Sequence, residues 1–297
     1  MKKYYPIILF LITIPLFGST DEKSSLWTIP ILEITEPMPK SEQQIVERYH
    51  DENGEPIPVL FKGAINDWDA ASWTPEYFAK NFGDKEIMTL PQKILEDGLE
   101  YDEGNKKSIE NFIHTTVKDH INDILHNPKN SGYFLAILPY GATEEDLLNG
   151  DGFTKNGLFI KDNLNIANQT KFPESIITPD AKQPRSYALF IGSGNSVTSL
   201  HSHGSTFLSQ IHGKKVARLI HPKDTSRCYC KKVIRKNFAE SCAVDITTPD
   251  FDKYPELKNL EVFQTILQPG DILYIPDGWL HDIRGLGEAS ISLASGF

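Results

Sequence analysis

Two stretches of sequence decide the predicted fold: Leu200-His201-Ser202-His203-Gly204 and, later, Pro276-Asp277-Gly278-Trp279-Leu280-His281. Side chains alternate across an extended strand, so His201 and His203 project from the same face of it. His281 follows a turn pattern and can reach that face from a distant strand. Imidazole nitrogens bind Fe, Zn, Cu and Ni. The two stretches therefore predict a strand-rich fold that closes around a three-histidine metal site.

The sequence around these histidines consists mainly of short apolar segments separated by Gly, Pro and Asp turns. The segments expected to form strands are 58–61, 132–138, 187–191, 197–201, 207–211, 215–220, 261–267, 272–275 and 290–293. Many short strands with turns between them are typical of a sandwich or a barrel. We predict a mainly β fold with flanking helices, in which a double-sheet jelly roll packs against helices near its N-terminal half.

Helices and loops are expected around the strands. A helix is predicted over residues 75–82, with Thr74 as its N-cap and Pro75 at its first position. A second helix is expected to begin at Ser108 and to include Ile113. The polar, turn-rich segment 141–184 is expected to form loops over one mouth of the domain.

Composition places the chain among ordinary folded domains. It has 297 residues, of which 39% are hydrophobic and 24% charged, which argues against wholesale disorder. The 30 basic and 40 acidic residues give a formal net charge of −10. This acidic balance gives no electrostatic reason to expect nucleic-acid binding.

The N-terminus has the pattern of a targeting segment. Lys2 and Lys3 precede the almost wholly apolar run Tyr4–Phe17. Such a run is short for a bilayer span but suits the apolar region of a signal peptide. We predict a signal peptide over residues 1–20 and one domain over residues 21–297. The chain would then enter the secretory pathway, without a stable membrane span once the signal is removed; an uncleaved anchor or a buried segment is the alternative.

The three cysteines, Cys228, Cys230 and Cys242, are an odd number. Entry into the secretory route would make disulfides possible. Cys228 and Cys230 are too close in sequence to bridge easily, so we expect Cys242 to pair with one of them.

The order of several short motifs resembles that of the JmjC and cupin-like 2-oxoglutarate-dependent oxygenases. These motifs are Pro58–Gly63, Asp67-Trp68, Trp73–Tyr77, Phe82–Asp84, Gly213–Leu219 and Pro269–Pro276, together with the two histidine stretches. The resemblance runs from Trp27 to the C-terminus and implies a double-stranded β-helix barrel with an iron site inside. The His-x-His-Gly form is similar to a JmjC-only branch resident in the endoplasmic-reticulum lumen. The resemblance thus implies that lumen as the location, or secretion, or the periplasm if the source is bacterial.

The resemblance also implies the metal ligands. In that family they read His-x-Asp/Glu…His, so His201 takes the first position and His281 the last. His203 takes the position usually held by a carboxylate. A neutral nitrogen there replaces an anionic oxygen and raises the net charge of the site by one. Three imidazoles still leave three octahedral positions, enough for a bidentate 2-oxo acid and O2.

The same comparison implies where the cosubstrate 2-oxoglutarate would bind. Its distal carboxylate needs a cation and a hydroxyl or two, because a buried carboxylate without partners is costly. The resemblance places Lys215 in the cation position, with Lys214 as the alternative if the register slips by one. Thr198 corresponds to a hydroxyl position, and Tyr133 to a phenol position that another register would give to Phe134.

Other polar residues near these motifs are expected to serve the fold. Asp271 lies in a Gly-Asp turn, and Asp282 is expected to be an outward neighbour of His281. His212 and His221 are expected to be structural.

Three functions are compatible with these residues. The first is an Fe(II)/2-oxoglutarate-dependent oxygenase that hydroxylates a protein or peptide side chain. The second is a catalytically inactive JmjC-fold protein that binds partners. The third is a three-histidine cupin metalloenzyme that does not use 2-oxoglutarate. Metal content together with 2-oxoglutarate turnover discriminates among them.

Overall fold

The structure is a computed structural model that describes residues 26–91, 112–173, 176, 186–232, 240–242 and 244–296. The predicted signal peptide, residues 1–20, and Ser108, the expected start of a second helix, lie outside the described residues. Within the described part, no helix is long and apolar enough to cross a membrane.

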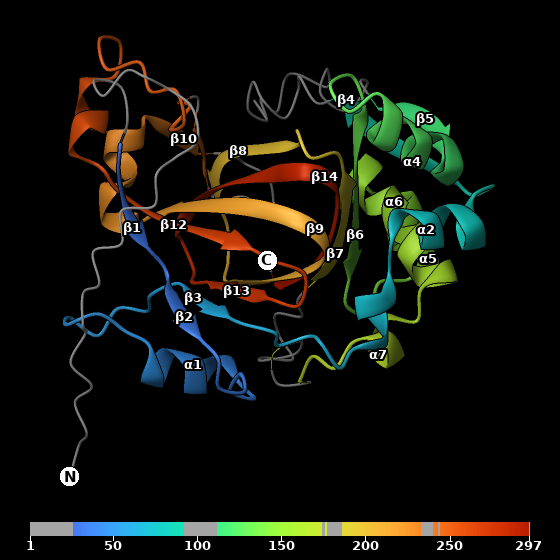
Figure 1. Cartoon of the computed structure of the whole chain (residues 1–297), viewed down its shortest axis with the longest axis horizontal. Coiled ribbons are helices and arrows are strands. Elements are labelled where there is room, and N and C mark those ends of the chain that lie inside the picture. Colours follow the sequence, from blue (N-terminus) through green and yellow to red (C-terminus); the bar gives the residue numbers. More distant parts are fainter. Residues whose placement is uncertain are drawn as a thin grey trace.

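Strands make up the centre of the molecule, and the helices gather at its sides (Figure 1). The strands are β1 (Trp27–Pro30), β2 (Leu32–Ile34), β3 (Val59–Phe61), β4 (Glu86–Pro91), β5 (Ile113–Thr116), β6 (Gly132–Pro139), β7 (Ser186–Gly192), β8 (Val197–Ser202), β9 (Thr206–Ile220), β10 (Cys230–Lys232), β11 (Glu240–Cys242), β12 (Glu261–Leu267), β13 (Ile272–Ile275) and β14 (Leu280–Gly296). The helices are α1 (Glu42–Arg48), α2 (Pro75–Phe82), α4 (Val117–His126), α5 (Glu144–Leu148), α6 (Gly152–Asn163) and α7 (Ile166–Gln169), with 3-10 turns η1 (Asp69–Ser72), η3 (Pro222–Cys228) and η4 (Pro255–Asn259).

Two long strands, β9 and β14, belong to both layers of the barrel. One layer has the order β2-β3-β13-β9-β14-β7-β6-β4-β5. The other runs from β10 through β11 and β8 to β14, and continues from β9 through β12 to β1. Strands that change from one sheet to the other at a bulge form the corners of such folds. The predicted jelly-roll barrel is confirmed, although the expected strands 207–211 and 215–220 are one continuous strand, β9.

The space between the two layers is filled by apolar side chains from both of them. This interior cluster includes Leu60, Leu90, Tyr133, Leu135, Ala188, Leu208, Ala217, Leu219, Leu267, Leu273, Trp279, Ile283 and Ala294, with Phe190 packed against it. Residues of β9 and of β6 thus meet inside the barrel, although they are far apart in sequence. The interior is a packed core that surrounds the polar groups described below.

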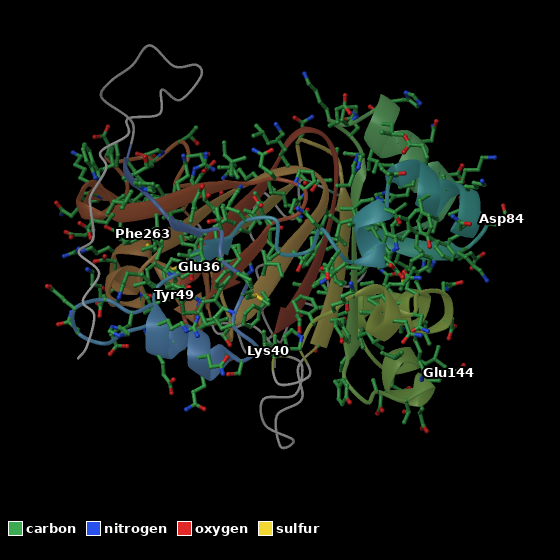
Figure 2. The ribbon with its side chains drawn as sticks, turned by 60° about the horizontal axis from the view of Figure 1, so that its bottom comes forward. Glu36, Lys40, Tyr49, Asp84, Glu144 and Phe263 are labelled. Carbon is green, nitrogen blue, oxygen red and sulfur yellow. A yellow bond between two sulfur atoms is a disulfide. The ribbon has the colours of Figure 1, made fainter. Side chains whose placement is uncertain are left out.

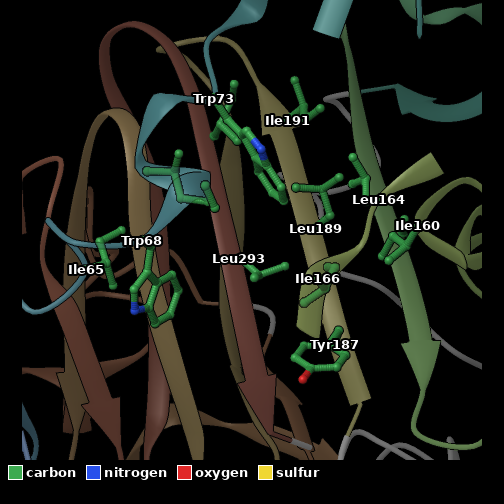
Figure 3. Packing of buried hydrophobic residues seen from close by; sticks show 14 of the residues in the cluster. Ile65, Trp68, Trp73, Ile160, Leu164, Ile166, Tyr187, Leu189, Ile191 and Leu293 are labelled. Atoms are coloured by element: carbon green, nitrogen blue, oxygen red, sulfur yellow. The ribbon is translucent and has the colours of Figure 1, made fainter. Parts of the chain in front are cut away.

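The outer face of the first layer is covered by helices and by the segment around η1. Figure 3 shows Trp68 and Trp73 from that segment, and Ile160 and Leu164 from α6 and the turn after it, gathered over the strands that carry Leu189 and Leu293. In Figure 2, Asp84 and Glu144 mark this helical side, whereas Tyr49 and Phe263 lie at the opposite side of the barrel. The predicted helix at residues 75–82 is α2, and Thr74 Oγ1 accepts a hydrogen bond from Tyr77 N at 3.1 Å, as expected of an N-cap.

Two expectations about the helical layer are wrong. The segment 141–184 contains α5, α6 and α7 instead of loops alone. Thr143 and Asp151 look like turn residues in the sequence, but each caps a helix with its side chain. Ile113 belongs to β5, and the helix that follows begins after Thr116, which caps α4. In each case a Ser/Thr/Asp residue marks a helix start because its oxygen accepts a hydrogen bond from a free backbone N–H.

The second layer is covered by the segment between β9 and β12. Cys230 and Cys242 form a disulfide across the β10–β11 pair, which selects one of the two predicted pairings. Cys228 lies outside this disulfide as a buried thiol, with its Sγ 3.6 Å from Asp224 O. Ser241 of β11 lies opposite His201 of β8. The disulfide therefore joins the short strand that flanks the histidine strand to the rest of its hairpin.

Candidate metal centre

Three histidines from two neighbouring strands come together inside the barrel. His201 on β8 pairs directly with His281 on β14, and His203 follows the end of β8. One nitrogen of each imidazole lies within 4.8 Å of the others, a grouping that can hold a metal ion. All three residues are at most 8% exposed. The structure thus brings together the three histidines that the sequence selected.

Backbone carbonyls fix the orientation of all three rings. His201 Nδ1 donates to Ser199 O at 2.8 Å, His203 Nδ1 to Gly204 O at 2.8 Å, and His281 Nδ1 to Trp279 O at 2.9 Å. A carbonyl oxygen can only accept, so each Nδ1 carries the ring hydrogen and each Nε2 is the nitrogen with the lone pair. Metal-binding histidines usually have a partner of this kind on the second nitrogen.

The electrostatics of the three rings fit a bound cation. Burial lowers the pKa of His201 to about 4 and that of His203 to about 3, and it lowers the pKa of His281 well below its usual value. The rings are therefore neutral near pH 7. His203 Nε2 and His281 Nε2 are 3.1 Å apart, although both are acceptors in this tautomer. Two lone pairs at that distance repel each other unless a cation lies between them, so the donor set suits a metal such as Fe, Zn or Cu.

A buried lysine on β9 lies on the same inner face of the barrel, opposite a later residue of β14 than His281. Lys215 is 2% exposed and pairs with Gly285 of β14. His281 and Gly285 are four residues apart, which corresponds to about 13 Å along an extended strand. Thr198 pairs with Ile283, between these two positions. Lysine, hydroxyl and histidines therefore line one continuous stretch of the interior.

Aromatic rings surround the lysine. Its Nζ lies 5.9 Å from the centre of the Tyr133 ring and 5.1 Å from that of Phe190. Tyr133 forms a hydrogen bond with Thr198, and burial raises the pKa of the phenol above its usual range. No carboxylate of the described residues forms an ion pair with Lys215, and burial lowers the pKa of its ammonium to about 7. A buried cation without an anionic partner is suited to an anionic ligand.

The two register alternatives are resolved by burial. Lys214 is exposed, so only Lys215 points into the barrel. Phe134 packs outward against Phe159 and His120 of the helical layer, whereas Tyr133 belongs to the interior cluster. The structure thus groups Tyr133 with Lys215, as the first of the two registers predicts.

Comparison with known proteins identifies the family. The sequence model of the cupin-like domain matches residues 47–295. The chain belongs to the cupin-like domain family. This match covers both histidine-bearing strands of the cupin-like barrel and the strand that carries Lys215.

Several relatives place this cupin-like domain in its JmjC branch. Lysine-specific demethylase 8 of Xenopus tropicalis is 26% identical over 272 residues, which make up 90% of this chain and 54% of that protein. HSPB1-associated protein 1 of Homo sapiens is 21% identical over 258 residues, which are 80% of this chain and 47% of that protein. JmjC domain-containing protein F of Dictyostelium discoideum is 37% identical over 124 residues, 37% of this chain and 26% of that protein. The chain thus spans about half, or less, of the length of these relatives.

Polar residues beside the cupin-like site mostly serve the fold, as the sequence predicts. The Asp271 carboxylate accepts hydrogen bonds from Lys62 Nζ at 2.6 Å, from Gly63 N at 3.1 Å and from Gln268 N at 2.9 Å. Asp282 forms an ion pair with Arg284, and its contacts are unrelated to the histidines. Both carboxylates hold strands and turns in place.

Two features of the site have no clear signal in the sequence. Phe190 contacts Lys215 across the barrel, but in the sequence it is one apolar residue of a buried strand. Gln210 of β9 is fully buried inside the barrel and bonds with Ser290 and Ser292 of β14. In the sequence, Gln210 is one of two polar residues, with Ser209, inside a short run of apolar residues.

Proposed function

We propose that the protein is an Fe(II)/2-oxoglutarate-dependent oxygenase that hydroxylates a side chain of a protein or peptide. The observation that supports this most directly is the placement of Lys215 and the three histidines on one inner face of the barrel. A five-carbon dicarboxylate has a chelating end and a charged end. The inner face of the barrel offers a partner for each end, the histidines for the chelating end and Lys215 for the charged end.

In this proposal His201, His203 and His281 hold the iron through Nε2. Iron held there would supply the chemistry by which O2, the oxidant, places one oxygen atom in a C–H bond and the other in succinate, while 2-oxoglutarate is oxidised to succinate with loss of CO2. The chain itself binds and orients the reactants. The Lys215 ammonium pairs with the distal carboxylate, and the hydroxyls of Thr198 and Tyr133 donate hydrogen bonds to it.

The apolar interior contributes to the same role. Leu219 pairs with His281 across the two strands, and Ile283 follows on the same face. Both are buried members of the interior cluster. Such walls exclude water, which strengthens the ion pair between a carboxylate and Lys215 because the local dielectric is low.

The location and the partners of the enzyme are part of the same proposal. We propose that residues 1–20 are a signal peptide, that residues 21–297 form one domain, and that the protein acts in the endoplasmic-reticulum lumen or outside the cell, or in the periplasm if bacterial. The Cys230–Cys242 disulfide supports an oxidising compartment. The names of lysine-specific demethylase 8 and HSPB1-associated protein 1 refer to a lysine and to a protein, which supports a protein substrate.

His203 favours a competing function. It stands where the resemblance places a carboxylate, so the metal keeps its full positive charge in a neutral ligand set. Such a site can bind metal without 2-oxoglutarate turnover, as in an inactive protein that binds partners or in a three-histidine metalloenzyme with another substrate. The proposed oxygenase and these alternatives differ in succinate production.

One experiment separates these functions. The chain is purified without oxygen, and bound metal and succinate production are measured for the wild type, His203→Asp and His203→Ala. His126→Ala, a change at the exposed end of α4, is the matched control. The proposal predicts about one iron per chain and 2-oxoglutarate-dependent succinate in the wild type, and loss of both in His203→Ala. An inert wild type with an active His203→Asp would establish the partner-binding alternative, and oxygen consumption without 2-oxoglutarate would establish the third function. Absence of iron from both wild type and His203→Asp would disprove the metal site itself.

A further inference from the structure

Strand β9 changes its inward face along its length. In its first half, Leu208 and Gln210 point into the barrel, while Phe207 and Ile211 pack against the helical layer. In its second half, Lys215, Ala217 and Leu219 point inward. The inward residues thus have even numbers before the change and odd numbers after it. Because side chains alternate strictly along a regular strand, one residue must be skipped between Ile211 and Lys215.

The skipped residue decides which lysine enters the barrel. A regular continuation from Leu208 and Gln210 would bring Lys214 to the inner face and leave Lys215 outside. The irregularity lies at Gly213, whose φ of +66° is a left-handed conformation that favours glycine. Pairing between β9 and β14 shifts on both sides of this position. Gln210 pairs with Ser292 and His212 with Ile291, so β9 has one extra residue there, and Lys214 then pairs with Leu286.

Backbone carbonyls at this bulge are bonded by one side chain. Gln210 Nε2 donates to His212 O at 2.6 Å and is 3.1 Å from Gly213 O. The amide is held in turn by β14, because Gln210 Nε2 lies 3.1 Å from Ser290 Oγ and Ser292 Oγ donates to Gln210 Oε1 at 2.8 Å. Gln210 and Ser292 are both 0% exposed. Where the pairing of β9 with β14 shifts, these backbone carbonyls depend on the Gln210 amide. Loss of such a buried hydrogen bond costs more stability than loss of one at the surface, because no water can replace it.

We propose that Gln210 is a positioning residue, whose amide holds the bulge at Gly213 and thereby directs Lys215, instead of Lys214, into the barrel. The inference rests on the proposed function only in assigning Lys215 to the cosubstrate carboxylate. The geometric part concerns the register of β9 alone. In the contacts described above, Gln210 touches neither the three histidines of the metal site nor the Lys215 ammonium, so its effect is on the backbone at His212 and Gly213.

The test uses Gln210→Met, which keeps the length of the side chain and removes both its donor and its acceptor. Gln264→Met on β12 is the matched control, because the Gln264 side-chain oxygen has no hydrogen-bond partner. Ser292→Ala is a milder second variant that frees the amide without removing it. Folding of each full-length variant is checked by circular dichroism and by one sharp thermal transition.

The first measurement reads the register directly. Folded protein is treated briefly with an amine-acylating reagent, and the modification of Lys214 and Lys215 is quantified by peptide mass spectrometry. In the wild type and in Gln264→Met, Lys214 reacts and Lys215 is protected. We expect acylation of Lys215 to rise at least about tenfold relative to Lys214 in Gln210→Met, and by less in Ser292→Ala. Protection of Lys215 as in the wild type, in both folded variants, would overturn the proposal.

The second measurement separates positioning from general damage. For 2-oxoglutarate turnover, Gln210→Met is expected to raise KM about tenfold while kcat at saturating 2-oxoglutarate and iron per chain stay within about twofold of the wild type. An equal loss of kcat and of bound iron would also overturn it, since the histidines would then have moved. If the wild type neither binds nor consumes 2-oxoglutarate, the proposed function fails, and the acylation result alone decides the role of Gln210.

Discussion

Replacement of Lys215 by methionine is expected to stabilise the ligand-free protein and to abolish its binding of 2-oxoglutarate. Methionine matches the length and apolar stem of the lysine but carries no charge. Lys215 is 2% exposed, and its ammonium has no anionic partner among the described residues. The ligand-free protein is therefore less stable than it would be with an uncharged side chain at this position. A residue that weakens the empty protein and is needed by the ligand is typical of a binding site.

The size of the effect follows from the pKa of the lysine. Burial lowers it from 10.5 to about 7, so the unfolded chain binds the proton more tightly than the folded one. The cost to folding is complete below pH 7, at about 5 kcal/mol, and it falls to about 1 kcal/mol by pH 10. Attraction between the ammonium and the two aromatic rings offsets about 2 kcal/mol of that cost. Lys215→Met should therefore be more stable by about 3 kcal/mol at pH 6 and by less than about 1 kcal/mol at pH 10.

Denaturant unfolding of the oxidised protein at pH 6 and at pH 10 measures this difference. Lys214→Met is the matched control, because Lys214 is the exposed neighbour and its replacement should change stability by less than about 0.5 kcal/mol at either pH. Addition of 2-oxoglutarate with metal should raise the midpoint of the wild type and of the control, but not that of Lys215→Met. A variant less stable than the wild type at pH 6, or a difference independent of pH, would refute the argument that Lys215 is an unpaired buried cation.

Three further predictions concern the contacts around the site. Joint replacement of Cys230 and Cys242 by serine should cost about 3 kcal/mol of unfolding free energy, since the disulfide closes a short loop of sequence separation 12; an unchanged denaturation midpoint would contradict this. Asp271→Asn should cost about 2 to 4 kcal/mol, because the carboxylate is buried and bonded to Lys62 and to two backbone N–H groups; thermal melts measure the loss, and one below about 0.5 kcal/mol would mean that the turn does not depend on the charge. Co²⁺ at a hundredfold excess over its Kd should stabilise the wild type by about 2.7 kcal/mol and leave His281→Ala unchanged, whereas equal stabilisation of both would place the ion elsewhere.

The strands that were predictable have apolar runs bounded by turn residues, and some of them, such as β7 and β13, are buried along nearly their whole length. Segments 261–267 and 272–275 coincide with β12 and β13, where apolar residues and flanking turn residues mark both ends. Helices α5 and α6 were not predictable in the same way, since Thr143 and Asp151 suit a turn as well as a helix cap. What distinguishes the two is packing: Gly157 of α6 lies directly against the carbonyl of Ile137 on β6, a contact between segments distant in sequence.

The histidine site was predictable from spacing and from motif order, but the choice between Lys214 and Lys215 was not. If side chains alternated regularly along β9, Lys214 would point into the barrel. Lys215 points inward only because the inward face changes near Gly213. That change depends on Gln210 and on two serines that come from β14, some eighty positions further along the chain. No local pattern encodes it, because the residues that hold the bulge are neighbours only after the barrel has closed.

The charges of the interior connect the unusual ligand with the unpaired lysine. A carboxylate in place of His203 would remove one positive charge from a bound divalent metal, whereas the imidazole leaves it in full. Lys215 adds a further positive charge when protonated, on the same inner face and without a carboxylate partner. Anionic charge that the protein does not supply must come from the ligand, since an uncompensated charge in a low-dielectric interior is costly. A dianion that reaches both the metal and the lysine would compensate both charges, so in the proposed oxygenase the cosubstrate supplies the negative charge that the imidazole of His203 does not.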